Sequence, residues 1–281
     1  MRNTVGWLLS LLLVCQLQLA GASAMTISDE LTPEEKRSAL ALAESFTKQW
    51  EENGDMKRIV ESLYAPDFIE RFIAEEKKEI GTLEEQTKGR IFMPGIEYLP
   101  SLLETAPKKE WRQLYITLSE LLFYFGSHTL NQMAGATLQG KEPESEQIGK
   151  SIERVIPEKM RQELARHPIL KNFVVKQSSA VPISTPAEMK EVIALLEKTK
   201  MQVRQTQGST VYQPTQAARK VMDMLMPEFQ KLISAENVNE SKFLLPPNTR
   251  MIVVPTRLLH FLVVAQFNGQ YKILWTAPIT I

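Results

Sequence analysis

A seven-residue stretch near the middle of the chain, residues 135–141, has the glycine spacing and the lysine of a phosphate-binding P-loop. In such a loop the glycine amides surround the phosphates and the lysine reaches the outer ones. The next residue, Glu142, stands where a Ser or Thr hydroxyl must bind magnesium, and its carboxylate would repel the phosphates. A helix, not a strand, is predicted before it. We therefore expect an ordinary polar loop from Gly135 to Ser145, in which Lys141 has no phosphate-binding role.

Metal and nucleophile chemistry has no local signature either. The histidines are His128, His167 and His260, and none belongs to a His-x-x-x-His pair. Residues 126–128, Gly-Ser-His, lack the Gly-x-Ser-x-Gly pattern of a nucleophile elbow. A pair of catalytic carboxylates is defined by its separation in space, so the acids on predicted helical faces cannot be matched from sequence. The sequence thus predicts no catalytic residue, no metal ligand and no cofactor.

The end of the chain holds the clearest local signal. Asn268-Gly269 is typical of a two-residue β-turn and joins two stretches rich in β-branched and aromatic residues. Apolar residues of both parities in 258–267 indicate that both faces of this hairpin are covered. A regular register from the turn pairs Phe267 with Gln270, Val264 with Ile273, Leu262 with Trp275, and His260 with Ala277.

Under that register His260, Leu262 and Trp275 share one face of the hairpin, and they are the candidate ligand-binding residues. Two arrangements are open. In the first, the face packs on helix side chains such as Phe46 and Trp50, and His260 is a hydrogen-bonded core residue. In the second, the face leaves a pocket where His260 handles a proton or orients a ligand, because imidazole changes charge near neutral pH. The packed arrangement is the one we expect.

Capping signals mark the helices that must position this hairpin. Thr32 followed by Pro33 and, three residues on, by Glu35 predicts a capping box and a first helix, which ends at Asn53-Gly54. The remaining predicted helices run from Asp55 to before Pro66, from Asp67, from about Pro107 to about Met133, near Pro157 to Arg166, from Thr185 and from Pro214.

These elements predict a helix-rich α+β protein, in which N-terminal and central helices pack on a small C-terminal antiparallel sheet that ends in a β-hairpin. Residues 25–240 form the mainly helical region, and residues 241–281 form a β-rich segment packed on it in one compact unit. Hydrophobic residues make up 43% of the chain, which excludes a disordered or fibrous protein. The 33 basic and 33 acidic residues give no electrostatic footprint for nucleic acid.

Residues 1–24 have the features of a cleaved secretory signal peptide: Arg2, an apolar run from Val5 to Leu19, and the small residues Ala22-Ser23-Ala24. Cleavage there removes Cys15, the only cysteine. An exported chain without cysteine favours a bacterial envelope, because secreted eukaryotic domains commonly use disulfides. A retained N-terminal anchor is the alternative. We expect a periplasmic or extracellular protein.

Two stretches resemble the nuclear-transport-factor-two-like superfamily. Residues 43–72 combine an amphipathic helix, an Asn-Gly-Asp break, a short helix and a Leu-Tyr-Ala-Pro-Asp-Phe exit, similar to the usual opening of that family; residues 261–275 are similar to its closing hairpin. The resemblance implies N-terminal helices joined to a curved antiparallel sheet that forms a cone. The family includes isomerases, cyclases and binding modules, so it does not select a function. The long helical region between the stretches departs from the family, and the chain as a whole also resembles exported bacterial proteins without an assigned role.

Apolar and aromatic residues are plentiful and no reactive constellation is visible, so we expect a non-catalytic binding or interaction protein of the bacterial envelope or secretome. It would bind another protein or a small apolar ligand, without nucleic acid and without a transmembrane segment after signal cleavage. The alternative is an enzyme with an acid-base pocket between the C-terminal sheet and the helices, built from His260 and helix carboxylates.

Overall fold

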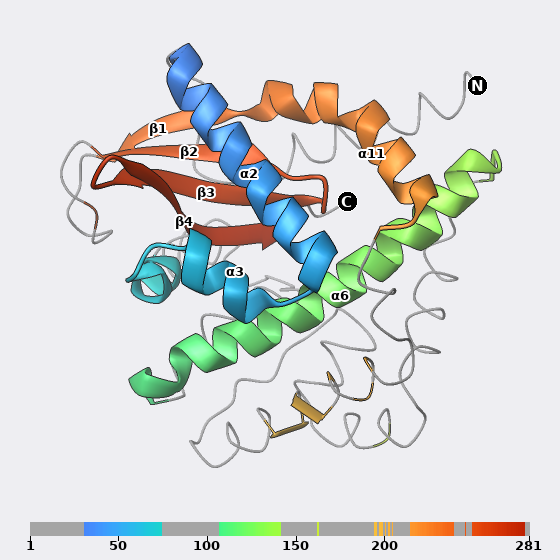
Figure 1. Cartoon of the computed structure of the whole chain (residues 1–281), viewed down its shortest axis with the longest axis horizontal. Helices are drawn as coiled ribbons and strands as arrows, with labels where there is room; N and C mark the ends of the chain where they lie inside the picture. Colours follow the sequence, from blue (N-terminus) through green and yellow to red (C-terminus); the bar gives the residue numbers. More distant parts are fainter. Residues whose placement is uncertain are drawn as a thin grey trace, which may run out of the picture.

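The computed structural model describes residues 31–74, 107–141, 162, 194–195, 197–198, 200, 202, 204, 214–238, 245 and 249–278. In this part of the chain helices are joined to a small C-terminal sheet of four antiparallel strands, so the fold is helix-rich α+β, as predicted (Figure 1). The predicted signal peptide with Cys15, the predicted cap at Thr185 and all but Gln162 of the predicted helix near 157–166 lie outside the described residues.

The first helix, α2 (Pro33–Asn53), begins and ends as its sequence predicts. The Thr32 hydroxyl accepts a hydrogen bond from the Glu35 N–H at 3.2 Å, and Glu35 Oε2 accepts one from the Thr32 N–H at 2.8 Å. This reciprocal pair satisfies two N–H groups that would otherwise lack partners at the start of the helix. At the other end Gly54 has a φ of 57°, and its N–H donates to the Trp50 carbonyl at 2.8 Å, which closes the helix.

The next helix, α3 (Met56–Leu63), is capped by Asp55, whose carboxylate accepts a hydrogen bond from a backbone N–H three residues on. The chain then meets the edge of the sheet, where Tyr64 forms a parallel bridge with Ile273. Residues 68–74 are helical, in agreement with the third predicted helix. The opening helices are therefore attached to the last described strand, which contains Ile273.

The long helix α6 (Trp111–Leu138) follows a short 3-10 helix, η2 (Lys108–Glu110), and continues past Met133, where the sequence predicted its end. The predicted polar loop is therefore wrong over residues 135–138, which are helical. The physical reason is packing: Ala134, directly before the glycine, is buried in an apolar cluster shared with a later helix. Burial of that neighbour outweighs the low helix propensity of one glycine.

Helix α11 (Gln216–Phe229) begins at Thr215, whose side chain caps it, and the short 3-10 helix η5 (Gln230–Leu232) leads into the sheet. The sheet starts before residue 241, where the sequence placed the β-rich segment, because residues 234–238 become a strand by pairing with the next one. The strands lie in sequence order: β1 (Ser234–Val238), β2 (Thr249–Pro255), β3 (His260–Phe267) and β4 (Gln270–Pro278).

The predicted two-residue turn joins β3 to β4. Asn268 and Gly269 have φ values of 48° and 79°, as a turn of this kind requires. The pairing follows the predicted register from the turn as far as Val264 with Ile273. Residues 260–265 are all buried, so both faces of β3 are covered, as the apolar residues of both parities predicted.

A β-bulge changes the register over the rest of the hairpin. β4 has one more residue than β3 at this point, so Trp275 pairs with Val263 and the predicted pair with Leu262 is wrong. For the same reason His260 pairs with Pro278, and the predicted pair of His260 with Ala277 is also wrong. Side chains alternate between the two faces of a strand, so the shift puts Trp275 in register with the face opposite to that of His260 and Leu262.

Two apolar clusters hold these elements together. Figure 1 shows α2 crossing the strands of the sheet and α6 running from the end of the molecule near α3 to the start of α11. The larger cluster joins α2, α3, the N-terminal half of α6 and the sheet, and the smaller joins the C-terminal part of α6 to α11. Helix α6 is therefore the element common to both. The described helices include none that is apolar over a length sufficient to cross a bilayer.

Candidate functional site

His260, the residue that the sequence nominated for proton chemistry, is enclosed by α6. Its ring stacks on the ring of Phe123, with centroids 3.9 Å apart and an interplanar angle of 22°. Its Nδ1 lies 2.7 Å from the Leu258 carbonyl oxygen, and only 6% of the residue is exposed. A methyl group added at Gly126 would lie 3.7 Å from His260 Cε1, so the helix backbone also approaches the ring closely.

The protonation state of His260 follows from this environment. Burial lowers the pKa of His260 to about 4, although the hydrogen bond with Leu258 opposes that shift. The ring is therefore neutral near pH 7. A carbonyl oxygen only accepts, so Nδ1 donates to it and the second ring nitrogen carries no proton.

Aromatic rings continue the packing around His260 toward α2. Phe123 lies 5.3 Å from Phe46 and 5.1 Å from Trp50, measured between ring centroids. Trp50 Nε1 donates a hydrogen bond of 3.4 Å to Ser127 Oγ on α6. His260 thus packs on Phe123, which packs on the two α2 residues that the sequence proposed as its neighbours.

The other two predicted ligand residues are also in the core, but the three do not form one group. Leu262 is fully buried, and Trp275 is 8% exposed. His260 and Leu262 have the same parity on β3, whereas Trp275 pairs with Val263. The bulge therefore separates Trp275 from the face on which it was expected.

The P-loop-like stretch does not form a cradle of free amides. Residues 135–138 belong to α6, and the amides that follow donate within the chain: Gly140 to the Thr137 carbonyl and Lys141 to the Ala136 carbonyl, each at 3.0 Å. A phosphate cradle needs such N–H groups to point at one centre. These amides are already used to close the end of the helix.

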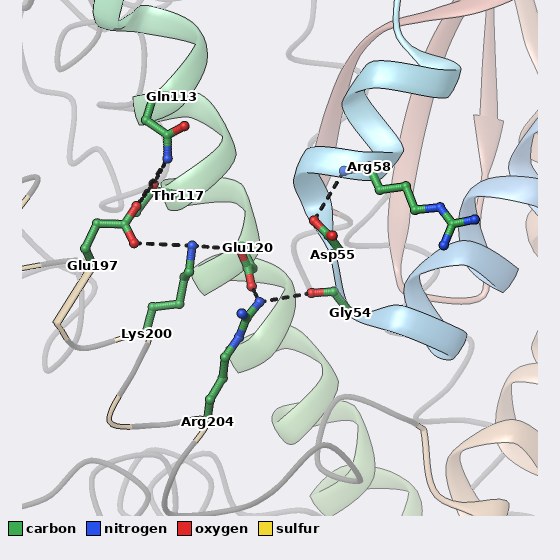
Figure 2. A network of polar contacts seen from close by, with 9 residues as sticks. All are labelled: Gly54, Asp55, Arg58, Gln113, Thr117, Glu120, Glu197, Lys200 and Arg204. Atoms are coloured by element: carbon green, nitrogen blue, oxygen red, sulfur yellow. Dashed lines mark hydrogen bonds and ion pairs between the residues drawn. The ribbon is translucent and has the colours of Figure 1, made fainter.

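A group of buried charges on α6, which the sequence analysis did not identify, is the second candidate (Figure 2). Glu120 has only 4% of its side chain exposed. Its Oε2 lies 3.0 Å from Lys200 Nζ, and its Oε1 forms an ion pair with Arg204. Lys200 Nζ is also 3.4 Å from Glu197 Oε2. Two carboxylates and two cations therefore lie together and balance in charge.

Glu197, Lys200 and Arg204 come from one part of the chain, which we call the 194–204 segment. The structure describes this segment at residues 194–195, 197–198, 200, 202 and 204. Every described residue of it is helical. Positions 197, 200 and 204 are three and four residues apart, which places them on one face of a helix. Figure 2 shows their side chains pointing toward α6.

Further polar contacts surround the charges. Thr117 Oγ1 donates to Glu197 Oε1 at 2.5 Å, and Gln113 Nε2 donates to the same oxygen at 3.3 Å. Burial alone would raise the pKa of Glu197, but the hydrogen bond from Thr117 and the charge of Lys200 together lower it. Arg204 Nη2 also donates to the Gly54 carbonyl at 3.3 Å, where the negative end of the α2 dipole favours a cation.

A signal for this group exists in the sequence. Glu120 is the only acidic residue between Trp111 and Leu138, and it stands among leucines where an amphipathic pattern would place apolar side chains. A buried acid requires a paired cation. The cations lie about 80 residues further along the chain, so only the folded structure identifies them.

A third polar group joins α6 to the last strand. Tyr115 Oη lies 3.4 Å from Tyr64 Oη and 3.3 Å from Thr276 Oγ1. Burial raises the pKa of both tyrosines, so their hydroxyls stay protonated at neutral pH. Phe68 packs edge-on against both rings. This group connects helices to sheet and presents no ionised nucleophile.

No protein-family model, no curated protein and no solved structure matches the chain. Within the described ranges, no three His, Cys, Asp or Glu side chains come together in a way that could hold a metal ion. The contacts of the His260 and Glu120 groups therefore carry the functional conclusion.

Proposed function

We propose that the protein is exported to the bacterial envelope or beyond and binds another protein there without catalysing a reaction. The features of residues 1–24 support export. The proposal that the protein does not catalyse a reaction rests on the environment of His260. Its ring stacks on Phe123, and the residue is 6% exposed.

An acid-base residue needs a pKa near the working pH and must reach the proton that it transfers. His260 meets neither condition, because burial lowers its pKa to about 4 and its Nδ1 is bonded to the Leu258 carbonyl. In the Glu120 group, each carboxylate oxygen of Glu120 has a cation. These two observations favour a binding protein over the alternative of an enzyme with a pocket at His260.

A protein partner is favoured over a small apolar ligand by the packing of the sheet. Leu262, Val264 and Ile273 have no exposed area, so the face that would receive an apolar ligand in the pocket arrangement is filled by the protein's own side chains. A binding partner would then use the outer surface of the helices. This is where the charged residues of α2 and α11 are exposed.

The resemblance to the nuclear-transport-factor-two-like superfamily is part of the same proposal. The order of α2, the Gly54 break, α3 and residues 68–74 supports it, as does the attachment of Tyr64 to β4. We propose that the chain combines such an opening and closing hairpin with the additional helices α6 and α11.

Export is tested by producing the full chain in a bacterial host and measuring the intact mass of the protein recovered from each cell fraction. We expect a periplasmic or extracellular species that lacks residues 1–24. A full-length species confined to the cytoplasm would contradict the proposal.

Binding is tested with a photo-reactive amino acid placed, one at a time, at exposed positions of three helices: Lys48, Leu138 and Met224. Met222, which is buried on the same helix as the exposed Met224, is the matched control. We expect a discrete adduct with an envelope protein from at least one exposed position and none from Met222.

Two outcomes would overturn the proposed function. Saturable binding of an apolar dye that Leu262→Phe abolishes would identify a small-ligand site. Turnover of a substrate that disappears in His260→Asn, with the fold intact, would identify an enzyme.

A further inference from the structure

Two Asn-Gly pairs occur in the chain, Asn53-Gly54 and Asn268-Gly269, and they have the same local chemistry. Asparagine is a labile side chain, and a glycine after it leaves the next backbone nitrogen without a side chain beside it. That nitrogen can attack Cγ of the asparagine and expel the side-chain amide as ammonia. Whether a pair reacts in the folded protein depends on the contacts of the attacking nitrogen and of the asparagine side chain.

The reaction needs water and no other reactant. A bond forms between the glycine nitrogen and Cγ while the Cγ–Nδ2 bond breaks, and the amide proton of the glycine leaves with Nδ2 in the ammonia. Water then opens the cyclic imide at either of its carbonyl carbons. Addition at Cγ restores the backbone and gives aspartate, whereas addition at the main-chain carbon gives isoaspartate, whose backbone runs through the side chain and is one methylene longer.

The first pair is restrained by the end of α2. Gly54 is buried, and its N–H donates a hydrogen bond of 2.8 Å to the Trp50 carbonyl. Asn53 is the last residue of α2, and its Nδ2 donates to the Gln49 carbonyl at 3.4 Å. Attack requires the glycine nitrogen to give up its proton and to approach Cγ, so both hydrogen bonds oppose the reaction.

The second pair forms the turn between β3 and β4. Asn268 and Gly269 are both exposed, and the pairing of the two strands ends at Phe267 and Gln270, so the turn lies beyond the last pair of the ladder. Among the backbone hydrogen bonds between described residues, one is donated by the Gly54 N–H and none by the Gly269 N–H. The restraint that holds the first pair is therefore not repeated at the second.

We propose that Asn268 is a site of spontaneous deamidation in the folded protein, and that the end of α2 protects Asn53. Aspartate fits the turn, because Asp-Gly is as typical of a two-residue hairpin turn as Asn-Gly. Isoaspartate does not fit, because it lengthens the backbone of a loop whose length sets the register of β3 and β4. The reaction thus adds a negative charge to the turn, and its isoaspartate product loosens the last hairpin.

The experiment ages the full chain in heavy-oxygen water at mildly alkaline pH, once folded and once in urea, and measures deamidation at both pairs by peptide mass spectrometry. In the folded protein we expect Asn268 to react about tenfold faster than Asn53 or more, equivalent to about 1.4 kcal/mol of activation free energy. In urea the two rates become similar, because unfolding removes the hydrogen bonds of Gly54 and Asn53. Equal rates in the folded protein, or a faster reaction at Asn53, would overturn the proposal, as would an Asn268 that reacts in urea but not in the folded protein.

Two variants test the effect on the hairpin. Asn268→Gly cannot deamidate and keeps a dipeptide that suits the turn, and Asn53→Ala removes the other pair as the matched control. We expect ageing to lower the urea midpoint of the parent and of Asn53→Ala, and to leave that of Asn268→Gly unchanged. An equal loss on ageing in the parent and in Asn268→Gly, or no loss in a parent that contains isoaspartate at position 268, would contradict the loosening of the hairpin.

Discussion

The imidazole of His260 and the phenyl ring of Phe123 lie nearly parallel, with centroids 3.9 Å apart, and join the first residue of β3 to the middle of α6. Burial lowers the pKa of His260 from 6.5 to about 4, so the ring in this contact is neutral near pH 7. The stability of the fold is therefore linked to the charge of one side chain in its core.

The first prediction concerns acid. The unfolded chain binds a proton at His260 below its ordinary pKa of 6.5, whereas the folded protein does not bind it until about pH 4. The contribution of His260 to the free energy of unfolding is thus complete above pH 6.5 and falls by about 3 kcal/mol between pH 6.5 and 4. His260→Gln, which does not bind a proton in this pH range, should flatten this part of the curve measured by urea unfolding at each pH.

His128 provides the control for that measurement. Burial also lowers the pKa of His128, but this side chain is only partly buried. His128→Gln should therefore change the pH dependence less than His260→Gln. Equal curves for the parent and His260→Gln would contradict the assignment of the acid sensitivity to His260.

The second prediction uses the close approach of α6 to His260. A Cβ at position 126 would lie 3.7 Å from His260 Cε1, which is an ordinary van der Waals contact and, outside the helix's own backbone, its one contact within 4 Å among the described residues. Gly126→Ala should stabilise the protein by about 0.5 to 1 kcal/mol, because alanine has the higher helix propensity. Gly126→Leu should destabilise it, because the larger side chain would displace the imidazole. Gly135→Ala, where a Cβ meets nothing within 4 Å, gives the propensity effect alone. Thermal unfolding of the three variants measures the differences.

The third prediction concerns the joint between α2 and β2. Glu35 closes the capping box and also accepts hydrogen bonds from Arg250 Nη1, at 3.1 Å to Oε1 and 2.8 Å to Oε2. Glu35→Ala should cost about 1 to 2 kcal/mol in chemical unfolding, since it removes a cap and an ion pair. Glu34→Ala, at the exposed neighbouring position in the same turn, should cost less.

The Glu35 carboxylate also makes the stability depend on pH, because it is the charged form of this group that the folded protein favours. Burial would raise the pKa of Glu35, but hydrogen bonds from Thr32 and Arg250 lower it below 4.5. Its contribution is present above the unfolded pKa of 4.5 and is lost as the pH falls through the folded value. In chemical unfolding at neutral pH, an equal loss of free energy of unfolding in Glu35→Ala and Glu34→Ala would contradict a stabilising role of the cap and of the contact with Arg250.

The fourth prediction concerns the N-terminus. Cleavage after Ala24 removes Cys15, so exported protein should begin at Met25 and contain no titratable thiol. Intact mass and thiol titration of the exported protein measure both properties. One thiol per chain, or an uncleaved N-terminus, would identify residues 1–24 as a retained anchor.

The sequence was sufficient wherever a structure depends on residues close together in the chain. The capping box of Thr32 and Glu35 spans three residues, and the turn at Asn268-Gly269 depends on the backbone freedom of two. The α+β fold class followed from the same kind of signal, because helical and strand periodicities are repeated within short windows. These structures are stabilised by contacts within a few residues, so their stability does not depend on how distant segments of the chain pack.

The tertiary structure alone decided what distant segments do to one another. One extra residue in β4 moved Trp275 from the face of Leu262 to a pairing with Val263, and no local signal marks that bulge. Burial of Ala134 kept the residues after it helical where glycine predicted a loop. The cations that neutralise Glu120 lie on a segment about 80 residues away, and their pairing is determined by packing in space. The sequence of this protein therefore determined its helix caps, its last turn and its fold class. Strand β1, the end of α6, the register of the last hairpin and the buried charges depended on long-range contacts, whose energies exist only once the chain is folded.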